Sequence, residues 1–382
     1  MLMENAQMRI GIVCYPTFGG SGVIATELGK ALAEKGHQVH FITYSQPVRL
    51  EHFAENVYFH EVSVADYPLF EFAPYETALT SKLVDVARFE KLDLVHVHYA
   101  IPHASVAYMA QKIMESQGLR LPFITTLHGT DITLVGKDES YSPVVTFAIN
   151  HSNAVTSVSK SLKDDTYKNF SVNKEIEVIP NFIDLKRFNK QHKDHFRRAI
   201  APSGEKILVH ASNFRPVKRI DDVLDIFKRV IRKIPSKLLL IGDGPERSKI
   251  EKECRELQAC EHIRFLGKLD AIEEILSVCD VFLLPSETES FGLAALEAMA
   301  CQVPVISSDT GGIPEVNIHG HTGFLSPVGN TDKMAEHAIH LLEDESRLEK
   351  FKKNAQAHSA NFDIRKILPL YENLYRKVIN ES

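Results

Sequence analysis

Residues 9–44, RIGIVCYPTFGGSGVIATELGKALAEKGHQVHFITY, contain the pattern that predicts the fold. Residues 9–15 and 38–44 are rich in apolar and β-branched side chains, which is typical of buried strands, whereas 23–35 spaces its apolar residues as one face of a helix does. A strand, a helix and a second strand in this order require a parallel sheet with helices on its faces. We therefore predict an α/β domain that begins at Met8.

The same alternation continues along the chain in two series. A charged stretch at 186–198 separates them, and domain boundaries commonly fall in such polar segments. We expect one doubly wound domain over 8–185, a second over 200–362, and a helix over 363–382 that packs back toward the first domain. Further strands are expected at 94–98, 123–127 and 154–158 in the first domain and at 207–211, 238–242, 263–266, 281–284 and 303–307 in the second.

The terminal segment after Phe362 has apolar residues three and four positions apart, which predicts one buried face of a helix. The apolar face consists of Ile364, Ile367, Leu368, Tyr371, Leu374, Tyr375 and Val378.

Composition excludes several classes of protein. With 382 residues, 44% hydrophobic and 25% charged, the chain has ordinary globular composition and room for two domains. A formal net charge of -6 gives no overall field for nucleic acid, and no apolar run approaches the roughly 18 residues that span a bilayer. We expect a cytoplasmic protein without nucleic-acid or membrane partners. The five scattered cysteines are interpreted as reduced, structural residues.

A glycine-rich loop at 17–22 lies between the first strand and its helix. Glycines let backbone amides approach an anion at a helix N-terminus. A dinucleotide-binding fingerprint needs G-x-G-x-x-G, which the spacing of Gly19, Gly20 and Gly22 does not match. A tight structural turn is therefore an alternative to an anion-binding loop.

In the second domain, the strand at 207–211 leads into SNFRPVKR at 212–219. Arg215 offers a planar fork of donors and Lys218 a compact charge, a combination suited to a diphosphate. The alternative is a solvated basic turn. The next strand leads into GDGP at 242–245, which is a turn and a possible neighbour of the phosphates, with Pro245 expected at the start of a helix.

Residues 285–298, PSETESFGLAALEA, run from a strand end through acidic and small residues into a helix. Glu289 is expected before this helix and Glu297 about two turns inside it, near its buried face. A carboxylate there needs a partner, such as the hydroxyls of a ribose or hexose, and the amides that begin the helix can bind phosphate oxygens. The alternative for Glu297 is an exposed helical glutamate.

Histidines raise the question of a metal site. His96 and His98 share one face of a strand and His103 follows, but no carboxylate or cysteine of matching spacing accompanies them, so we expect no metal. His128 follows the strand at 123–127, and its loop position favours ligand contact over a capping or core role.

Taken together, the chain resembles the GT-B glycosyltransferases of family four over nearly its full length. Glu289 and Glu297, with seven residues between them, look like the E-x7-E signature of that family. Supporting matches are VIPN at 178–181, the Arg215 and Lys218 pair, GDGP at 242–245 and GGIPE at 311–315, whereas Asn213 and Phe214 stand before Arg215 where many relatives carry glycine. The resemblance implies two Rossmann-like domains facing a central cleft, retention of the anomeric configuration, and catalysis without a metal. It also implies that Glu289 binds sugar hydroxyls and Glu297 the ribose. The absence of an Asp-x-Asp pair agrees with metal-free catalysis.

Within the family, residues 14–22, 96–103 and 127–131 are similar to the branch that transfers N-acetylglucosamine to L-malate in bacillithiol biosynthesis. This resemblance implies UDP-N-acetylglucosamine as donor, L-malate as acceptor and no cofactor. We expect catalytic roles for Arg215, Lys218, Glu289 and His128, donor contacts from Gly20, Asn213, Gly242, Ser290, Phe291, Gly292, Leu293 and Glu297, and acceptor contacts from Ser21, Gly22, Tyr99, Thr126 and His128.

Other functions remain open at this point. The acceptor could instead be an inositol phosphate, a sugar or a lipid, and a GT-B sugar-nucleotide 2-epimerase would use the donor alone. A non-catalytic sugar-nucleotide-binding protein is disfavoured because Arg215, Lys218, Glu289 and Glu297 are all present. A homo-oligomer is compatible with the sequence, which does not specify the oligomeric state.

Overall fold

The computed structural model describes residues 6–50, 54–64, 71–134, 138–256 and 260–381. The chain divides into two compact units, unit 1 (Met1–Asn181 with Ile364–Ser382) and unit 2 (Phe182–Asp363). Each unit is built on one parallel sheet, so the predicted class of two doubly wound α/β domains is confirmed. The charged stretch at 186–198 falls within unit 2, because Lys190 and Arg197 donate to backbone carbonyls of that unit.

Unit 1 contains a seven-stranded sheet in the order β3-β2-β1-β4-β5-β6-β7. Its two edge strands were not predicted. β3 has no fully buried side chain and β7 has only three residues, so neither shows the long apolar run of an inner strand. The strands are β1 (Arg9–Val13), β2 (Gln38–Thr43), β3 (Val57–Glu61), β4 (Leu94–His98), β5 (Phe123–Leu127), β6 (Ala154–Ser157) and β7 (Ile176–Val178).

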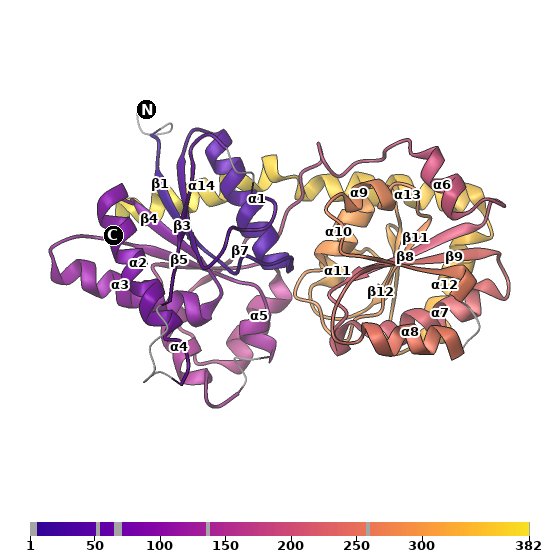
Figure 1. Cartoon of the computed structure of the whole chain (residues 1–382), viewed down its shortest axis with the longest axis horizontal. Coiled ribbons are helices and arrows are strands. Elements are labelled where there is room, and N and C mark those ends of the chain that lie inside the picture. Colours follow the sequence, from indigo (N-terminus) through magenta and orange to yellow (C-terminus); the bar gives the residue numbers. More distant parts are fainter. Residues whose placement is uncertain (1–5, 51–53, 65–70, 135–137, 257–259, 382) are drawn as a thin grey trace. The chain divides into compact units, whose positions relative to one another are not determined.

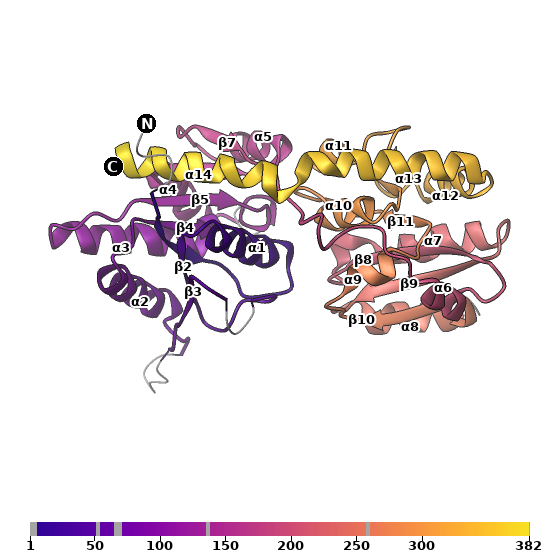
Figure 2. The same ribbon diagram turned by 90° about the horizontal axis from the view of Figure 1, so that it is seen from above.

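Helices cover the sheet of unit 1 in two groups (Figure 2). Helix α1 contacts the terminal helix α14, and α3 contacts both α2 and α4. Helix α1 begins at Gly20, three residues before the predicted start. The helices and helical turns are α1 (Gly20–Glu34), α2 (Tyr75–Glu90), η1 (Ala100–Ala104), α3 (Ser105–Ser116), η2 (Thr130–Leu134), α4 (Ser142–His151), α5 (Lys160–Asn169) and α14 (Ile364–Glu381).

The terminal helix α14 buries the apolar face that its sequence predicts. All seven predicted residues, and no others in this helix, are buried. The Tyr375 hydroxyl shares a hydrogen bond of 2.7 Å with His96 Nδ1 in β4, and Glu372 lies 3.1 Å from His37 Nε2. Apolar burial and these polar contacts together fix α14 to unit 1, although it follows unit 2 in sequence. No helix among the described residues is long and apolar enough to cross a membrane.

Unit 2 contains a six-stranded parallel sheet in the order β10-β9-β8-β11-β12-β13. Helices α9, α10 and α13 lie on one side of its strands and α7, α8 and α12 on the other (Figure 1). The strands are β8 (Lys206–Ser212), β9 (Ser236–Gly242), β10 (Ile263–Gly267), β11 (Val281–Leu284), β12 (Val305–Ser308) and β13 (Gly323–Ser326). The helices and turns are α6 (Asp194–Ile200), η4 (Pro216–Lys218), α7 (Ile220–Ile231), α8 (Arg247–Glu256), η5 (Cys260–His262), α9 (Ile272–Leu276), α10 (Leu293–Ala300), α11 (Ile313–Val316), α12 (Thr331–Leu342), α13 (Glu345–Ser359) and η6 (Ala360–Phe362).

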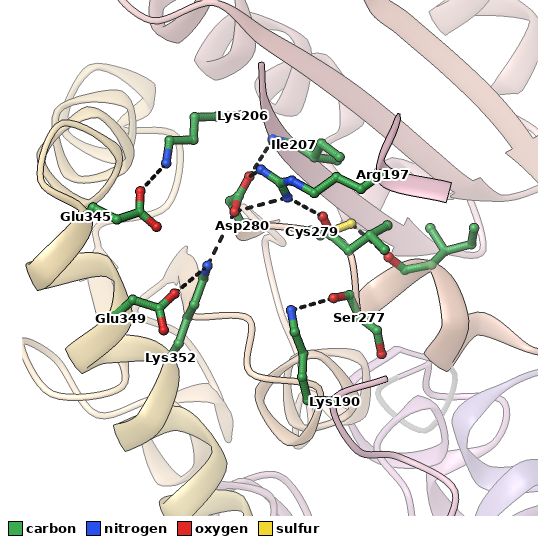
Figure 3. A network of polar contacts seen from close by, with 12 residues as sticks. Lys190, Arg197, Lys206, Ile207, Ser277, Cys279, Asp280, Glu345, Glu349 and Lys352 are labelled. Carbon is green, nitrogen blue, oxygen red and sulfur yellow. Dashed lines mark hydrogen bonds and ion pairs between the residues drawn. The ribbon is translucent and has the colours of Figure 1, made fainter. Parts of the chain in front are cut away.

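A buried ion network ties α6 and α13 to the sheet of unit 2 (Figure 3). Asp280 is 2% exposed. One of its carboxylate oxygens accepts from the Arg197 guanidinium at 3.0 Å and from the Ile207 N–H at 2.9 Å, and the other lies 3.4 Å from Lys352 Nζ. Because the buried carboxylate has two cationic partners and a backbone donor, its desolvation is compensated.

Candidate functional site

In doubly wound sheets, ligands bind beyond the carboxyl ends of the strands where the strand order reverses. In unit 2 this point lies between the neighbouring strands β8 and β11, and in unit 1 between β1 and β4. The loops after these four strands contain most of the residues that the sequence singled out. Neither strand order is readable from the sequence, so this placement comes from the structure alone.

The loops after β8 and β11 bring Lys218 and Glu289 into direct contact. Lys218 Nζ donates to Glu289 Oε1 at 2.5 Å, and Ser286 Oγ donates to the same oxygen at 2.9 Å. The two charged side chains are 20% and 13% exposed. They form a partly desolvated ion pair in which each charge can also reach a bound ligand. Ser286 was not predicted, although it precedes Glu289 by only three residues.

Arg215 behaves differently from Lys218. It stands at the start of η4 and is exposed, and within the described part of the chain its guanidinium has no hydrogen bond or ion pair. Asn213 is also exposed. An Arg guanidinium is a strong bidentate ligand for phosphate oxygens. Arg215 is therefore free to bind an anion at the same loop that positions Lys218.

Glycines allow the backbone to pack closely against the loops after β8 and β11. A Cβ on Gly312 would lie 2.3 Å from Ser290 O, and one on Gly242 would lie 1.8 Å from Ser212 O. The N–H of Gly312 donates to Glu289 O at 2.9 Å. Only glycine fits at such distances, so the glycines at 311–312 fix the backbone that carries Glu289. Gly242 allows its backbone to pack closely on the loop after β8. The prediction for Pro245 was wrong, because α8 begins at Arg247 and Pro245 lies in the turn before it.

Helix α10 begins immediately after the Glu289 loop. Gly292 precedes it with a φ of 93°, a left-handed conformation that glycine adopts without strain. Phe291 is 2% exposed and packs edge-to-face on Phe362 with centroids 5.6 Å apart, which anchors the loop, while Ser290 and Leu293 remain partly exposed. Glu297 is 9% exposed, so it is buried as expected, but it lies about one turn inside the helix, not two.

His210 in β8 joins the two strands whose loops carry Lys218 and Glu289, and the sequence did not predict this role. Its Nδ1 donates to Leu283 O at 2.9 Å, so its Nε2 accepts from Ser212 Oγ at 2.8 Å. Burial, together with the nearby Lys218 charge, lowers the pKa of His210 to about 4. The imidazole is therefore neutral and links the two strands on which the loops stand. Its position inside an apolar strand gave no signal in the sequence.

In unit 1 the corresponding loops also meet through a side-chain hydrogen bond. The Tyr99 hydroxyl, after β4, donates to Ser21 Oγ at the start of α1 at 2.8 Å. Tyr99 has a φ of 89°, which is strained for a residue with a side chain. Gly20 is exposed, and a Cβ on Gly22 would lie 2.5 Å from two carbonyl oxygens of the β1 loop. These residues bring the first turn of α1 against the β1 loop.

His128 lies beside this pair, and Thr126 lies deeper. His128 is 7% exposed, its Nε2 shares a hydrogen bond of 2.8 Å with His98 Nδ1, and burial lowers its pKa to about 3. The ring of His128 is 5.3 Å from that of Tyr99. Thr126 is fully buried, and its hydroxyl bonds His96 and another threonine. The structure therefore brings Ser21, Tyr99 and His128 together but leaves the Thr126 hydroxyl in the core.

Among the described residues, one group of three could offer ligands to a metal ion, namely His40, His60 and Glu90. His40 Nδ1 and His60 Nε2 already share a hydrogen bond of 3.0 Å, and Glu90 is exposed. This group is on β2, β3 and the end of α2, away from the loops after β1 and β4. Both ring nitrogens of His96, which the sequence raised as a metal ligand, bond to protein hydroxyls.

Known proteins with related chains identify the family. A family model described as Glycosyltransferase Family 4 matches residues 18–187, and one described as Glycosyl transferases group 1 matches residues 191–358. N-acetyl-alpha-D-glucosaminyl L-malate synthase of Bacillus anthracis is 46% identical over 378 residues, which cover 98% of each chain.

Solved structures show the same fold. Sucrose-phosphate synthase from Thermosynechococcus elongatus superimposes with a TM-score of 0.82 at 22% identity over 98% of this chain and 100% of that chain. HepE of Anabaena, in complex with UDP and glucose, superimposes with a TM-score of 0.82 at 21% identity over 96% of this chain and 99% of that chain. The resemblance expected from the motifs is therefore confirmed, and the chain belongs to the family 4 glycosyltransferases, which are enzymes of the GT-B fold.

Proposed function

We propose that this glycosyltransferase transfers N-acetylglucosamine from UDP-N-acetylglucosamine to the hydroxyl of L-malate, with retention of the anomeric configuration and without a metal, as the first step of bacillithiol biosynthesis in the cytoplasm. The observation that carries this proposal is the 46% identity to the Bacillus anthracis synthase over 98% of both chains. The three stretches 14–22, 96–103 and 127–131, in which we see the likeness to this branch, all lie in unit 1.

The donor binds to unit 2 in this proposal. Arg215 and Lys218 take the diphosphate, helped by the amides that begin α10, and Glu297 takes the ribose hydroxyls. Lys218 already donates to Glu289 at 2.5 Å in the free site. When the diphosphate arrives, Lys218 turns to its oxygens, and the carboxylate of Glu289 becomes available to accept hydrogen bonds from the sugar hydroxyls. Asn213, Gly242 and the loop at 290–293 complete this site.

The acceptor binds to unit 1. The Tyr99 hydroxyl donates to Ser21 Oγ, the ring of His128 lies 5.3 Å from that of Tyr99, and the buried Gly22 follows Ser21. A dicarboxylate needs several donors, and the first-turn amides of α1 and the hydroxyls supply them without a fixed cation. Thr126 is fully buried, its hydroxyl is bonded within the core, and its backbone carbonyl accepts from the Tyr99 N–H at 2.9 Å, so in this proposal it positions Tyr99 for the acceptor.

In the reaction, the malate hydroxyl oxygen forms a bond to C1 of the sugar while the bond from C1 to the β-phosphate oxygen breaks. The hydroxyl attacks from the face that the diphosphate leaves, which retains the configuration without an enzyme nucleophile. The hydroxyl proton passes to the departing diphosphate, which takes the place of an enzyme base. Negative charge grows on the β-phosphate as this bond breaks, and the fixed positive charges of Arg215 and Lys218 stabilise the transition state more than the ground state.

The test is UDP release from UDP-N-acetylglucosamine in the presence of EDTA, with L-malate, D-malate, inositol phosphate or no acceptor. Release with L-malate alone supports the proposal, and NMR of the product reports whether the α configuration is kept. Conversion of the donor without any acceptor would identify a 2-epimerase instead. Release with inositol phosphate but not L-malate would assign a different acceptor, and silence with all of them would overturn the proposed substrates.

A further inference from the structure

Two of the five cysteines lie in direct contact on unit 2, in a position that the expectation of purely structural cysteines does not explain. Cys254 near the end of α8 and Cys260 at the start of η5 have their sulfur atoms 3.0 Å apart. Cys254 is 1% exposed, whereas Cys260 is exposed. Both are free thiols, so the pair combines an accessible sulfur with a buried neighbour.

The other three cysteines are chemically shielded. Cys14, Cys279 and Cys301 are all buried. Burial raises the pKa of Cys14 and of Cys301 to about 12 and that of Cys279 well above its ordinary value. Since a reagent in solution must reach the sulfur and the thiolate is the reactive form of cysteine, none of these three is a first point of attack. Any reagent that attacks this protein in its folded state therefore meets Cys260 first.

We propose that Cys254 and Cys260 form a site of reversible covalent modification by low-molecular-weight disulfides, which ends in a disulfide bond between them. The Cys260 thiolate attacks one sulfur of the reagent, and the other sulfur leaves as a thiolate and takes up a proton. Cys254 then gives its proton to solvent and attacks the Cys260 sulfur, expelling the second reagent thiol. Two protein thiols and one disulfide thus become one protein disulfide and two small thiols, with two electrons transferred.

The geometry favours the second step over a lasting mixed disulfide. A disulfide needs a sulfur–sulfur distance of about 2.05 Å, so closing the pair requires a movement of about 1 Å. Burial is the largest cause of the raised pKa of Cys254, and the hydrogen bond and charge of Cys260 raise it further. Once Cys260 is in a mixed disulfide, its thiol hydrogen bond and thiolate charge are gone, so the resolving thiol becomes easier to ionise.

The experiment uses the full reduced chain without a histidine tag, with oxidised glutathione as the reagent at pH 8. Remaining thiols are counted under denaturing conditions, and tryptic peptides are analysed without reduction. Trypsin cleaves after Lys252, Arg255 and Arg264, so the two cysteines fall in different peptides that only a disulfide can join. We expect the protein to lose two of its five thiols, to yield the joined peptides, and to recover all five thiols with dithiothreitol.

Variants separate the two steps. In Cys254→Ala the reaction should stop at a mixed disulfide between glutathione and Cys260, with one thiol lost. Cys260→Ser should lose no thiol. Cys14→Ser is the matched control and should still lose two. Because Cys260 is exposed, its substitution spares the core, and circular dichroism checks the fold of all variants. A stable mixed disulfide in the unsubstituted protein, a bond to any other cysteine, or retention of all five thiols over hours would each overturn the proposal. The outcome does not depend on the substrates proposed above.

Discussion

Replacing Gly312 by alanine is expected to lower kcat by about 10- to 100-fold while the protein stays folded. A Cβ at Gly312 would lie 2.3 Å from Ser290 O and 2.9 Å from Phe291 Cα, whereas Cβ contacts below 3.0 Å are essentially never seen. The difference between 3.0 and 2.3 Å means that Ser290 must move by about 0.7 Å. A displacement of about 1 Å at a reacting group can cost about 100-fold in rate, or about 2.7 kcal/mol of activation free energy.

The backbone conformation makes this a steric test. Gly312 has a φ of -82°, which alanine adopts without strain, so the change adds a clash and little else. Gly320→Ala is the matched control in the same unit. Gly320 has a φ of 72° with no atom within 4 Å of a Cβ, so alanine there costs about 1 kcal/mol of folding free energy but displaces nothing.

Initial rates of UDP release at varied donor concentration give kcat and KM, and urea unfolding gives the stability of each variant. We expect Gly312→Ala to lose activity out of proportion to stability and Gly320→Ala to lose stability with kcat unchanged. If Gly312→Ala retained kcat within twofold, or if Gly320→Ala lost as much activity, the loop at 287–292 would not be held by these glycines in the way that the structure indicates.

Three further predictions concern charge. Lys218→Met should lower kcat at least 100-fold with a smaller change in donor KM, because in the proposed mechanism the lysine stabilises charge that grows in the transition state, and steady-state kinetics decide this. Asp280→Asn should lower the free energy of unfolding by about 3 kcal/mol, measured in urea, because the buried Lys352 and the partly exposed Arg197 both lose this buried carboxylate. Stability should fall as the pH drops below 6.5, since burial lowers the pKa of His96 to about 3 and that of His210 to about 4. Between pH 6.5 and the lowered pKa, each histidine is protonated in the unfolded chain but neutral in the folded chain. The free energy of unfolding therefore falls by about 1.4 kcal/mol per pH unit for each histidine. Burial raises the pKa of Asp131 to about 6, so this carboxyl binds a proton more readily in the folded chain and stabilises it as the pH falls. The histidines outweigh this one group, so a urea midpoint that increased as the pH was lowered from 6.5 to 5 would contradict their burial.

The inner strands and the terminal helix were predictable because the local spacing of their apolar residues indicates which side chains are buried. In α14, the seven residues spaced at three and four are the seven that the structure buries. The edge strands were missed for the same reason, since β3 pairs with only one neighbour and has no fully buried side chain. The observed start of α1, at Gly20, differs from the predicted one because the helix begins with glycine and serine. A pattern of apolar residues cannot indicate the start of a helix whose first residues have no apolar side chain.

The site was predictable as a set of loops but not as an arrangement. Arg215, Lys218 and Glu289 were named from the chemistry of their side chains and their positions after strands. That Lys218 meets Glu289 follows from β8 lying next to β11, a pairing between strands more than 70 residues apart that no local pattern encodes. His210 depends on the same pairing, because it bonds a carbonyl of β11, so it could be found only once the sheet was known. Ser286 bonds Glu289 within one loop, three residues away, and was missed although the contact is local.

The ion pair changes how the separate roles of its members should be understood. In the proposed function, Lys218 considered alone is a phosphate ligand and Glu289 a ligand for sugar hydroxyls. At 2.5 Å they neutralise each other in the free site, so a bare phosphate must compete with Glu289 for the lysine and places its own charge beside that carboxylate. A nucleotide sugar presents both partners at once, a diphosphate for Lys218 and hydroxyls for Glu289, and leaves neither charge unpaired. The pair would therefore discriminate in favour of the intact donor over its phosphate-bearing fragment. Glu289→Gln, which removes the competing charge and keeps the shape, is expected to tighten UDP binding while it weakens the binding of UDP-N-acetylglucosamine relative to UDP, and calorimetric titration of both ligands would show whether the two affinities move apart in this direction.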